Sequence, residues 1–256
     1  MTELKVFVGY DGNEKIAYEV LKHSIEKNTS SDVKIIPLYH KELRRQGYFQ
    51  RPWVTEALTG NRLDMMDGRP FSTEFSHTRF LIPELMKSKG WALFMDCDMI
   101  VRCDIKEIFD LRDERYAVMC VKHRQEVKKS MKMDGSPQTA YYRKNWSSFM
   151  LINCAHAANK KLSRDVVNTA SGGWLHGFSW LDDNQIGALP DHYNWIEGTS
   201  RGMEYPRVIH YSEGGPWHDG YKDVMYADQW DELYRAVLEA YPEPNAQLTN
   251  IDYSNI

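Results

Sequence analysis

The chain has 256 residues, enough for one large domain or two small ones, and its 42% hydrophobic and 27% charged residues are ordinary for a globular protein. Its formal charge of −4, from 32 basic and 36 acidic residues, excludes an overall attraction to nucleic acid or anionic membrane. No stretch approaches the ~20 consecutive apolar residues of a membrane-spanning helix.

The first forty residues predict a βαβ unit. Residues 5–10 form an apolar run that ends at the turn-like Asp11-Gly12-Asn13. Residues 14–27 place apolar side chains at helical spacing, and 33–38 form a second apolar run. A strand, a helix and a strand at this spacing predict parallel pairing of the two strands.

The rest of the chain continues this alternation without repeats or a low-complexity linker. One α/β domain with a mostly parallel central sheet, flanked by helices, is therefore the economical interpretation. In chain order we expect a polar surface excursion over 40–70, a helix over 73–89, strands over 91–95, 116–121 and 148–153, a short helix starting in 182–188, a strand over 207–211, a helix over 227–240 and a fraying tail.

Two carboxylates lie one residue apart in Met95-Asp96-Cys97-Asp98-Met99, with apolar residues on both sides. Strand alternation would place Asp96 and Asp98 on the same face, ~7 Å apart along the backbone. Burying two carboxylates is costly unless a cation or hydrogen-bond donors compensate them. A divalent ion with a phosphate on its far side would do so, and the pair therefore predicts a metal site.

His210 strengthens this prediction. Ligands of open α/β sheets bind at the carboxyl ends of strands, where the carboxylate pair and His210 are both expected. Gly214-Gly215 follows, and its bare backbone could approach a phosphate closely. A lone acidic pair is more often solvated, and a lone histidine is more often a core residue. Two carboxylates, an imidazole and diphosphate oxygens would together complete the octahedral coordination sphere of an ion such as Mn²⁺.

Four stretches between residues 4 and 217 carry a resemblance to a known enzyme family. They are Val8-Gly9-Tyr10-Asp11, the run from Ser76 to Leu85 leading into Phe94–Val101, the run Ser147–Asn153, and Trp180–Gln185 together with His210–Trp217. The last three are similar to an arginine-bearing helix followed by "YLDaDiiv", to "NSGvmliN", and to the pair "DQDilN" and "HxxGxxKPW". In this order they resemble the motifs of family 8 glycosyltransferases, which are retaining enzymes on the GT-A fold.

The resemblance implies a role for each matching position. Asp96, Asp98 and His210 would bind Mn²⁺ or Mg²⁺. Arg79 would meet the diphosphate or the donor sugar, and Asp182 or Asp183 would meet the sugar hydroxyls, so that these three are the catalytic candidates. Contacts with the nucleotide-sugar are expected from Val8, Tyr10, Asp11, Arg79, Asp96, Cys97, Ser148, Asn184, Gly214 and Gly215.

The resemblance also implies one GT-A domain over 1–256. Its nucleotide-binding half would span about 1–105, and the half for acceptor and donor sugar about 106–220. A C-terminal helix and tail, 221–256, would complete it.

Two positions depart from the family pattern. Ser148 stands where the family has a glycine, which would crowd the donor sugar slightly. Gly215 precedes Pro216-Trp217, where the family has a lysine that helps to neutralise the leaving diphosphate. His218, Lys222 or the Gly214-Gly215 backbone could substitute for that lysine.

The implied function is metal-dependent transfer of a hexose, with retention, from a nucleotide-sugar such as a UDP-sugar to a hydroxyl of a glycan, a lipopolysaccharide or another polymer. The basic segment 122–144 is interpreted either as a solvated loop or as a lid for an anionic or glycan acceptor, with Tyr141, Tyr142 and Trp146 as stacking surfaces. No nucleic-acid motif supports a nucleic-acid acceptor.

Two alternatives compete with transfer. One is a catalytically weak nucleotide-sugar-binding protein, which the missing lysine favours. The other is a metal-dependent nucleotidyltransferase, which needs a Gly-rich phosphate loop that Asp11-Gly12-Asn13 does not supply.

The cellular compartment is predicted from cysteine usage and from the N-terminus. Cys97, Cys103, Cys120 and Cys154 have no CxxC or metal-finger spacing and lie in or beside apolar runs, so we expect reduced, partly buried thiols. Met1–Lys5 enters a strand-like run directly, without an apolar signal segment. Both features predict a cytoplasmic protein.

Overall fold

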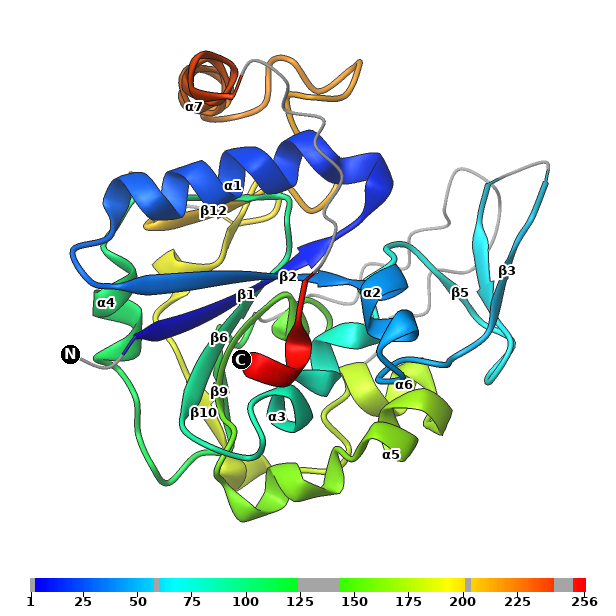
Figure 1. Cartoon of the computed structure of the whole chain (residues 1–256). Helices are drawn as coiled ribbons and strands as arrows, with labels where there is room; N and C mark the ends of the chain where they lie inside the picture. Colours follow the sequence, from blue (N-terminus) through cyan, green and yellow to red (C-terminus); the bar gives the residue numbers. More distant parts are fainter. Residues whose placement is uncertain (1–2, 58–59, 124–142, 201–203, 242–250) are drawn as a thin grey trace.

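The computed structural model describes residues 3–57, 60–123, 143–200, 204–241 and 251–256. Its main sheet has six strands, in the spatial order β10 (Ile186–Ala188), β8 (Val118–Cys120), β9 (Phe149–Asn153), β6 (Trp91–Met95), β1 (Leu4–Tyr10) and β2 (Val33–Tyr39) (Figure 1). β9 runs antiparallel to both of its neighbours, and the other three pairings are parallel. The prediction of a mostly parallel central sheet is therefore confirmed.

Helix α1 (Lys15–Asn28) connects β1 to β2, as the predicted βαβ unit requires. Figure 1 shows α1 between the main sheet and α7 (Ala227–Ala240), the helix predicted over 227–240. One face of α1 buries Leu21 and Ile25 in the main core. Val20 instead joins a second cluster, which includes Trp230 of α7. Helix α1 is thus buried on two sides by two separate apolar clusters.

A second sheet carries the strand that follows the acidic pair. It consists of β11 (Trp195–Ile196), β12 (Val208–His210) and β7 (Met99–Val101), with β12 antiparallel to β7. β6 belongs to the main sheet and β7 to the second, so Asp96-Cys97-Asp98 is the bend between two sheets. The predicted strand alternation through Asp98 is therefore wrong.

The segment 40–70 is more ordered than the predicted surface excursion. It contains α2 (His40–Arg45) and an antiparallel sheet of β3 (Trp53–Thr55), β4 (Arg62–Asp64) and β5 (Pro70–Phe71). A buried ion pair anchors it, because Nε of Arg51 lies 3.0 Å from both carboxylate oxygens of Asp64. The Arg51 guanidinium also donates to the carbonyl oxygens of Val167 and Ala170. In a segment of polar composition, the sequence alone does not show that one arginine and one aspartate form a buried pair.

The predicted helix 73–89 is reduced to the 3₁₀ segment η2 (Thr78–Leu81) and α3 (Ile82–Leu85). It stops there because Lys87 and Ser88 adopt left-handed φ angles of 52° and 55°. The predicted helix start in 182–188 is the 3₁₀ turn η5 (Asp183–Gln185), followed by β10. The remaining segments are α4 (Ile105–Phe109), α5 (Arg164–Thr169), α6 (Gly172–His176), η1 (Gly12–Glu14), η3 (Trp146–Ser148), η4 (Ala157–Lys161), η6 (Asp191–Tyr193) and η7 (Tyr253–Asn255).

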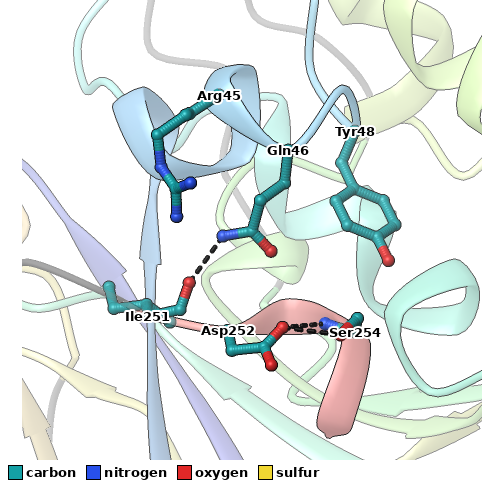
Figure 2. A pocket seen from close by; sticks show the side chains of 6 residues that line it. All are labelled: Arg45, Gln46, Tyr48, Ile251, Asp252 and Ser254. Atoms are coloured by element: carbon teal, nitrogen blue, oxygen red, sulfur yellow. Dashed lines mark hydrogen bonds between the residues drawn. The ribbon is translucent and has the colours of Figure 1, made fainter.

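The last six residues pack onto the domain, so the predicted fraying is wrong for 251–256. The Tyr253 hydroxyl donates to the Pro37 carbonyl oxygen (2.5 Å) and accepts from the Tyr39 N–H (3.0 Å). The Gln46 amide donates to the Ile251 carbonyl oxygen, as Figure 2 shows. The cavity drawn there, about 430 Å³, is lined by Arg45, Gln46, Tyr48, Ile251, Asp252 and Ser254. The terminus thus lies against α2.

Replacing Tyr253 by phenylalanine should lower the free energy of unfolding by about 1–3 kcal/mol, because the buried Pro37 carbonyl and Tyr39 N–H lose a shared partner. Denaturant unfolding followed by circular dichroism measures this. Tyr205→Phe is the control, since that side chain is 71% exposed. Equal stability of the two variants would contradict the predicted anchoring role of the tail.

All four cysteines are free and buried, which agrees with the prediction of reduced thiols. Burial raises the pKa of the Cys97 thiol well above its ordinary value, and the nearby Asp98 carboxylate raises it further. The thiol is therefore inert at neutral pH. Among the helices of the described ranges, none is long and apolar enough to cross a membrane.

Candidate active site

Two strand registers hold the bend that carries the acidic pair. β6 pairs with β9 up to Met95 and Phe149, and the Asp96 N–H then donates to the Ser148 carbonyl oxygen (2.9 Å). β7 pairs with β12 so that Met99 faces His210, while the Asp98 carbonyl oxygen accepts from the N–H of the residue after His210. Asp96 is thereby fixed by one sheet, and Asp98 and His210 by the other.

The structure brings Asp96, Asp98 and His210 together, as the sequence predicts. One ligand atom from each lies within 4.8 Å of the others, and His210 Nε2 is 3.3 Å from Asp98 Oδ1. Oδ1 of both aspartates is buried without an aligned hydrogen bond in the described part of the chain, although Arg79 and His210 lie at ion-pair distance. The carboxylate side chains keep 15% and 22% exposure, so an ion can reach them.

The three groups of this triad influence one another electrostatically. Burial raises the pKa of Asp96 to about 7; Arg79 opposes this rise and the neighbouring Asp98 carboxylate adds to it. Burial acts in the same direction on Asp98, but His210 outweighs it and lowers the pKa of Asp98. Burial would lower the pKa of His210, yet the negative charge of Asp98 beside it raises it. The positive charges of Arg79 and His210 thus offset part of the cost of burying the two carboxylates.

Arg79, on η2, is a preorganised cation beside the triad. Its Nη1 lies 2.7 Å from Asp96 Oδ1 and donates to the Ser147 carbonyl oxygen (2.9 Å). The guanidinium carbon lies 5.2 Å and 4.8 Å from the ring centroids of Phe75 and Phe94. Gly9 is required here, because a Cβ at that position would lie 2.4 Å from the Phe75 ring. Arg79 therefore cannot turn away from Asp96 without losing several contacts.

The predicted nucleoside residues lie at the carboxyl end of β1. The Tyr10 ring is buried edge-on against two other tyrosines, and burial raises its pKa to about 12. The Asp11 carboxylate accepts from the N–H groups of Asn13 and Glu74 (both 2.9 Å) and pairs with Arg62 (3.1 Å). Sequence reasoning missed Arg62 and Glu74, because Arg62 lies in the expected surface excursion and Glu74 in the first turn of the expected helix over 73–89.

Val8 and Cys97 are fully buried, so neither residue offers an exposed surface for the predicted nucleotide contact. The Gly214-Gly215 turn requires glycine at both positions, for the backbone angle of the first and for the close packing of the second. Gly214 has φ 139°, and a Cβ on Gly215 would lie 2.0 Å from the Trp217 ring. The Gly214 N–H already donates to the carbonyl oxygen of Tyr211 (3.0 Å).

Comparison with known proteins identifies the family of this chain. The family model described as "Glycosyl transferase family 8" matches residues 15–220. The chain belongs to glycosyl transferase family 8. It is 46% identical over 231 residues to Protein CDI of Arabidopsis thaliana, covering 88% of this chain and 84% of that protein.

Solved structures confirm that this family 8 chain has the GT-A type of fold. WbbM, a bifunctional glycosyltransferase, is similar with a TM-score of 0.59 and 17% identity over 94% of this chain, which spans about half (51%) of WbbM. The galactosyltransferase LgtC, solved with donor and acceptor sugar analogues, has a TM-score of 0.56 and 14% identity, covering 94% of this chain and 100% of LgtC. At such identities the likeness concerns the fold.

The residues predicted to match the family's acidic motif lie at the N-cap and within η5, at the amino end of β10. Asp182, Asp183 and Asn184 are exposed there. Asp183 forms an ion pair with Arg143, whose guanidinium also donates to the Gly177 carbonyl oxygen (2.6 Å). In the described ranges, neither aspartate has a hydrogen bond or ion pair to Arg79 or to the triad. Most of the predicted basic lid, residues 124–142 with Tyr141 and Tyr142, lies outside the described residues.

Glu14 and His218 form a pair that sequence reasoning did not assign. Oε1 of Glu14 lies 3.3 Å from Nε2 of His218. Burial raises the pKa of Glu14, and the negative charge of Asp98 raises it further, which places Glu14 beside the acidic pair. Lys222, another candidate for the missing family lysine, donates to the Pro216 carbonyl oxygen (2.6 Å). No sequence spacing links these positions.

Proposed function

We propose that this family 8 glycosyltransferase transfers a hexose, with retention, from a UDP-sugar to an acceptor hydroxyl on a glycan or related polymer. The observation that carries this proposal is the triad of Asp96, Asp98 and His210, with two buried carboxylate oxygens that lack aligned partners among the described residues. Two carboxylates and one imidazole suit Mn²⁺ or Mg²⁺. A divalent ion held there would act as a Lewis acid toward the charge that develops on the departing diphosphate.

The chain's own residues prepare the site for that charge. Arg79 presents a fixed cation beside Asp96, and a fixed donor needs no reorganisation when negative charge develops. Asp182 and Asp183 are proposed to bind donor sugar hydroxyls. Their exposure and the Asp183–Arg143 pair do not favour either as a nucleophile. Retention would then come from attack on the face that the diphosphate leaves, with the leaving phosphate accepting the acceptor proton.

The pH dependence of metal binding follows from the triad. Mn²⁺ binds deprotonated ligands, whereas Asp96 has a pKa of about 7 and the pKa of His210 is raised. Protons therefore compete with the metal at low pH, and affinity should rise between about pH 6 and about pH 8, with up to about tenfold per pH unit for each proton displaced. Calorimetry in buffers of different ionisation enthalpy measures the protons released. An affinity that does not change over this range would contradict the assigned ligands.

The activity itself is tested by UDP release with a panel of UDP-sugars, with Mn²⁺ and with a chelator. We expect release that requires Mn²⁺ and a product glycoside of unchanged anomeric configuration. Tight Mn²⁺-dependent UDP binding without turnover of any sugar would instead support the nucleotide-sugar-binding alternative, which the absent family lysine favours. Turnover of other nucleotide-sugars alone would show that the proposed donor is wrong.

A further inference from the structure

A continuous line of buried hydrogen bonds runs from the backbone at Asn145 to His210. The Ser148 hydroxyl donates to the Asn145 carbonyl oxygen (2.8 Å) and accepts from the Asn194 amide nitrogen (3.0 Å). The Asn194 amide oxygen lies 2.9 Å from His210 Nδ1. Ser148, Asn194 and His210 are 4%, 0% and 2% exposed, so water cannot replace these partners.

Only one assignment of donors and acceptors satisfies every hydrogen bond in this line. A carbonyl oxygen accepts only, so the single hydroxyl proton of Ser148 is used on Asn145. The hydroxyl oxygen must then accept, which turns the amide nitrogen of Asn194 toward Ser148 and its oxygen toward His210. His210 Nδ1 must donate to that oxygen, and the remaining ring nitrogen, Nε2, is the one that lies 3.3 Å from Asp98.

We propose that Ser148, acting through Asn194, is a positioning residue that holds neutral His210 in the Nδ1–H tautomer, with the Nε2 lone pair directed at the space shared with Asp96 and Asp98. This rests on the proposed function, since the lone pair serves a divalent ion. The hydrogen bond made by one imidazole nitrogen decides which nitrogen is left for a metal. Ser148 is thus proposed to orient His210, in addition to the crowding of the donor sugar that the sequence predicts.

A backbone turn sets the direction of the whole line. Asn145 has a left-handed φ of 64°, and the Trp146 N–H donates to the Arg143 carbonyl oxygen (3.2 Å). This turn aims the Asn145 carbonyl at Ser148. With alanine or glycine at position 148, the Asn194 amide would lose the partner that distinguishes its nitrogen from its oxygen. It could then rotate by half a turn and favour the opposite tautomer of His210.

The tautomer can be observed without any metal. Long-range ¹H–¹⁵N correlation spectra of protein labelled with ¹⁵N-histidine, recorded at alkaline pH and assigned with His210→Ala, report which nitrogen of neutral His210 carries the proton. We expect Nδ1–H in the native protein and a mixture or the opposite form in Ser148→Ala. A native His210 with its proton on Nε2 would overturn the proposal, whatever the variants do.

Affinity for Mn²⁺ alone, measured by electron paramagnetic resonance, is the second readout. Asn194→Ala should weaken binding by about 10–100-fold and Ser148→Ala by about tenfold. Since Ser148 acts through Asn194, adding Ser148→Ala to Asn194→Ala should change affinity by less than about twofold. Additive losses would show that Ser148 acts by another route and would overturn the proposal.

Ser24→Ala is the matched control. Its hydroxyl is also buried, donates to the Leu21 carbonyl oxygen and accepts from the Val101 N–H. Mn²⁺ affinity should be unchanged in this variant. Failure of the native protein to bind Mn²⁺ would refute the proposed function, while the tautomer measurement would still decide this inference. Native binding with an unaffected Ser148→Ala variant would refute this inference alone.

Discussion

Asp98→Asn should abolish Mn²⁺-dependent binding of UDP-sugar while the protein remains folded. Of the two aspartates of the triad, Asp98 is the one whose pKa is lowered despite burial, because His210 favours its charged form. It is therefore ionised at neutral pH and can bind a cation directly. Removing a hydrogen-bond partner of a metal ligand costs about 10–100-fold in affinity, so loss of a ligand charge should exceed about 100-fold.

The fold should survive this substitution, since an asparagine at position 98 would keep the backbone carbonyl that accepts from the Tyr211 N–H (2.9 Å). Calorimetric titration with Mn²⁺ and UDP-sugar measures the loss, and thermal unfolding checks the fold. Asp110→Asn is the matched control, because the Asp110 side chain is 52% exposed and pairs with Lys106 on the surface. Unchanged Mn²⁺-dependent affinity in Asp98→Asn would remove Asp98 from the metal site.

Arg79→Met should lower kcat/KM for UDP-sugar by about 10²–10³-fold, the usual cost of losing a fixed donor at a developing negative charge. The pKa of Asp96 should rise above its native value of about 7, because Arg79 is the strongest influence that lowers it. Protons would then compete with Mn²⁺ at a higher pH than in the native protein. Methionine fills similar space beside Phe75 and Phe94 but brings no charge.

In Arg79→Met, the effect of losing the positive charge can be distinguished from the effect of altered packing. The pH at which half of the Mn²⁺ affinity is lost should shift upward, which a purely structural defect would not produce. Arg207→Met provides the comparison, since its side chain is 47% exposed and lies 3.7 Å from Glu107. An Arg79→Met enzyme with kcat/KM within about threefold of native and an unshifted pH profile would show that Arg79 has no part in catalysis.

The convergence of Asp96, Asp98 and His210 could be predicted because it depends on features that are local in sequence. Apolar runs predict the strands, and parallel strands end at one edge of a sheet. The strand alternation expected to bring the two carboxylates together was nevertheless wrong. The two carboxylates converge because the chain bends from one sheet into another, and the β7–β12 register then sets His210 beside Asp98.

Contacts between distant polar residues could not be predicted. The proposed orientation of His210 depends on Asn194 and Ser148, which are 46 residues apart and form a hydrogen bond only in the folded chain, where the residues just before β9 and β11 meet. The Arg51–Asp64 pair similarly organises strands too short to show periodicity. Such pairs carry no apolar pattern, so only the folded chain reveals them.

The metal assignment is tested most directly by anomalous diffraction from crystals soaked with UDP and Mn²⁺. We expect one strong anomalous peak for a manganese ion bound by Asp96, Asp98 and Nε2 of His210. Diphosphate oxygens of UDP should complete the coordination of this ion. A manganese peak elsewhere, or UDP bound with no manganese among these three side chains, would contradict the proposed metal-dependent mechanism.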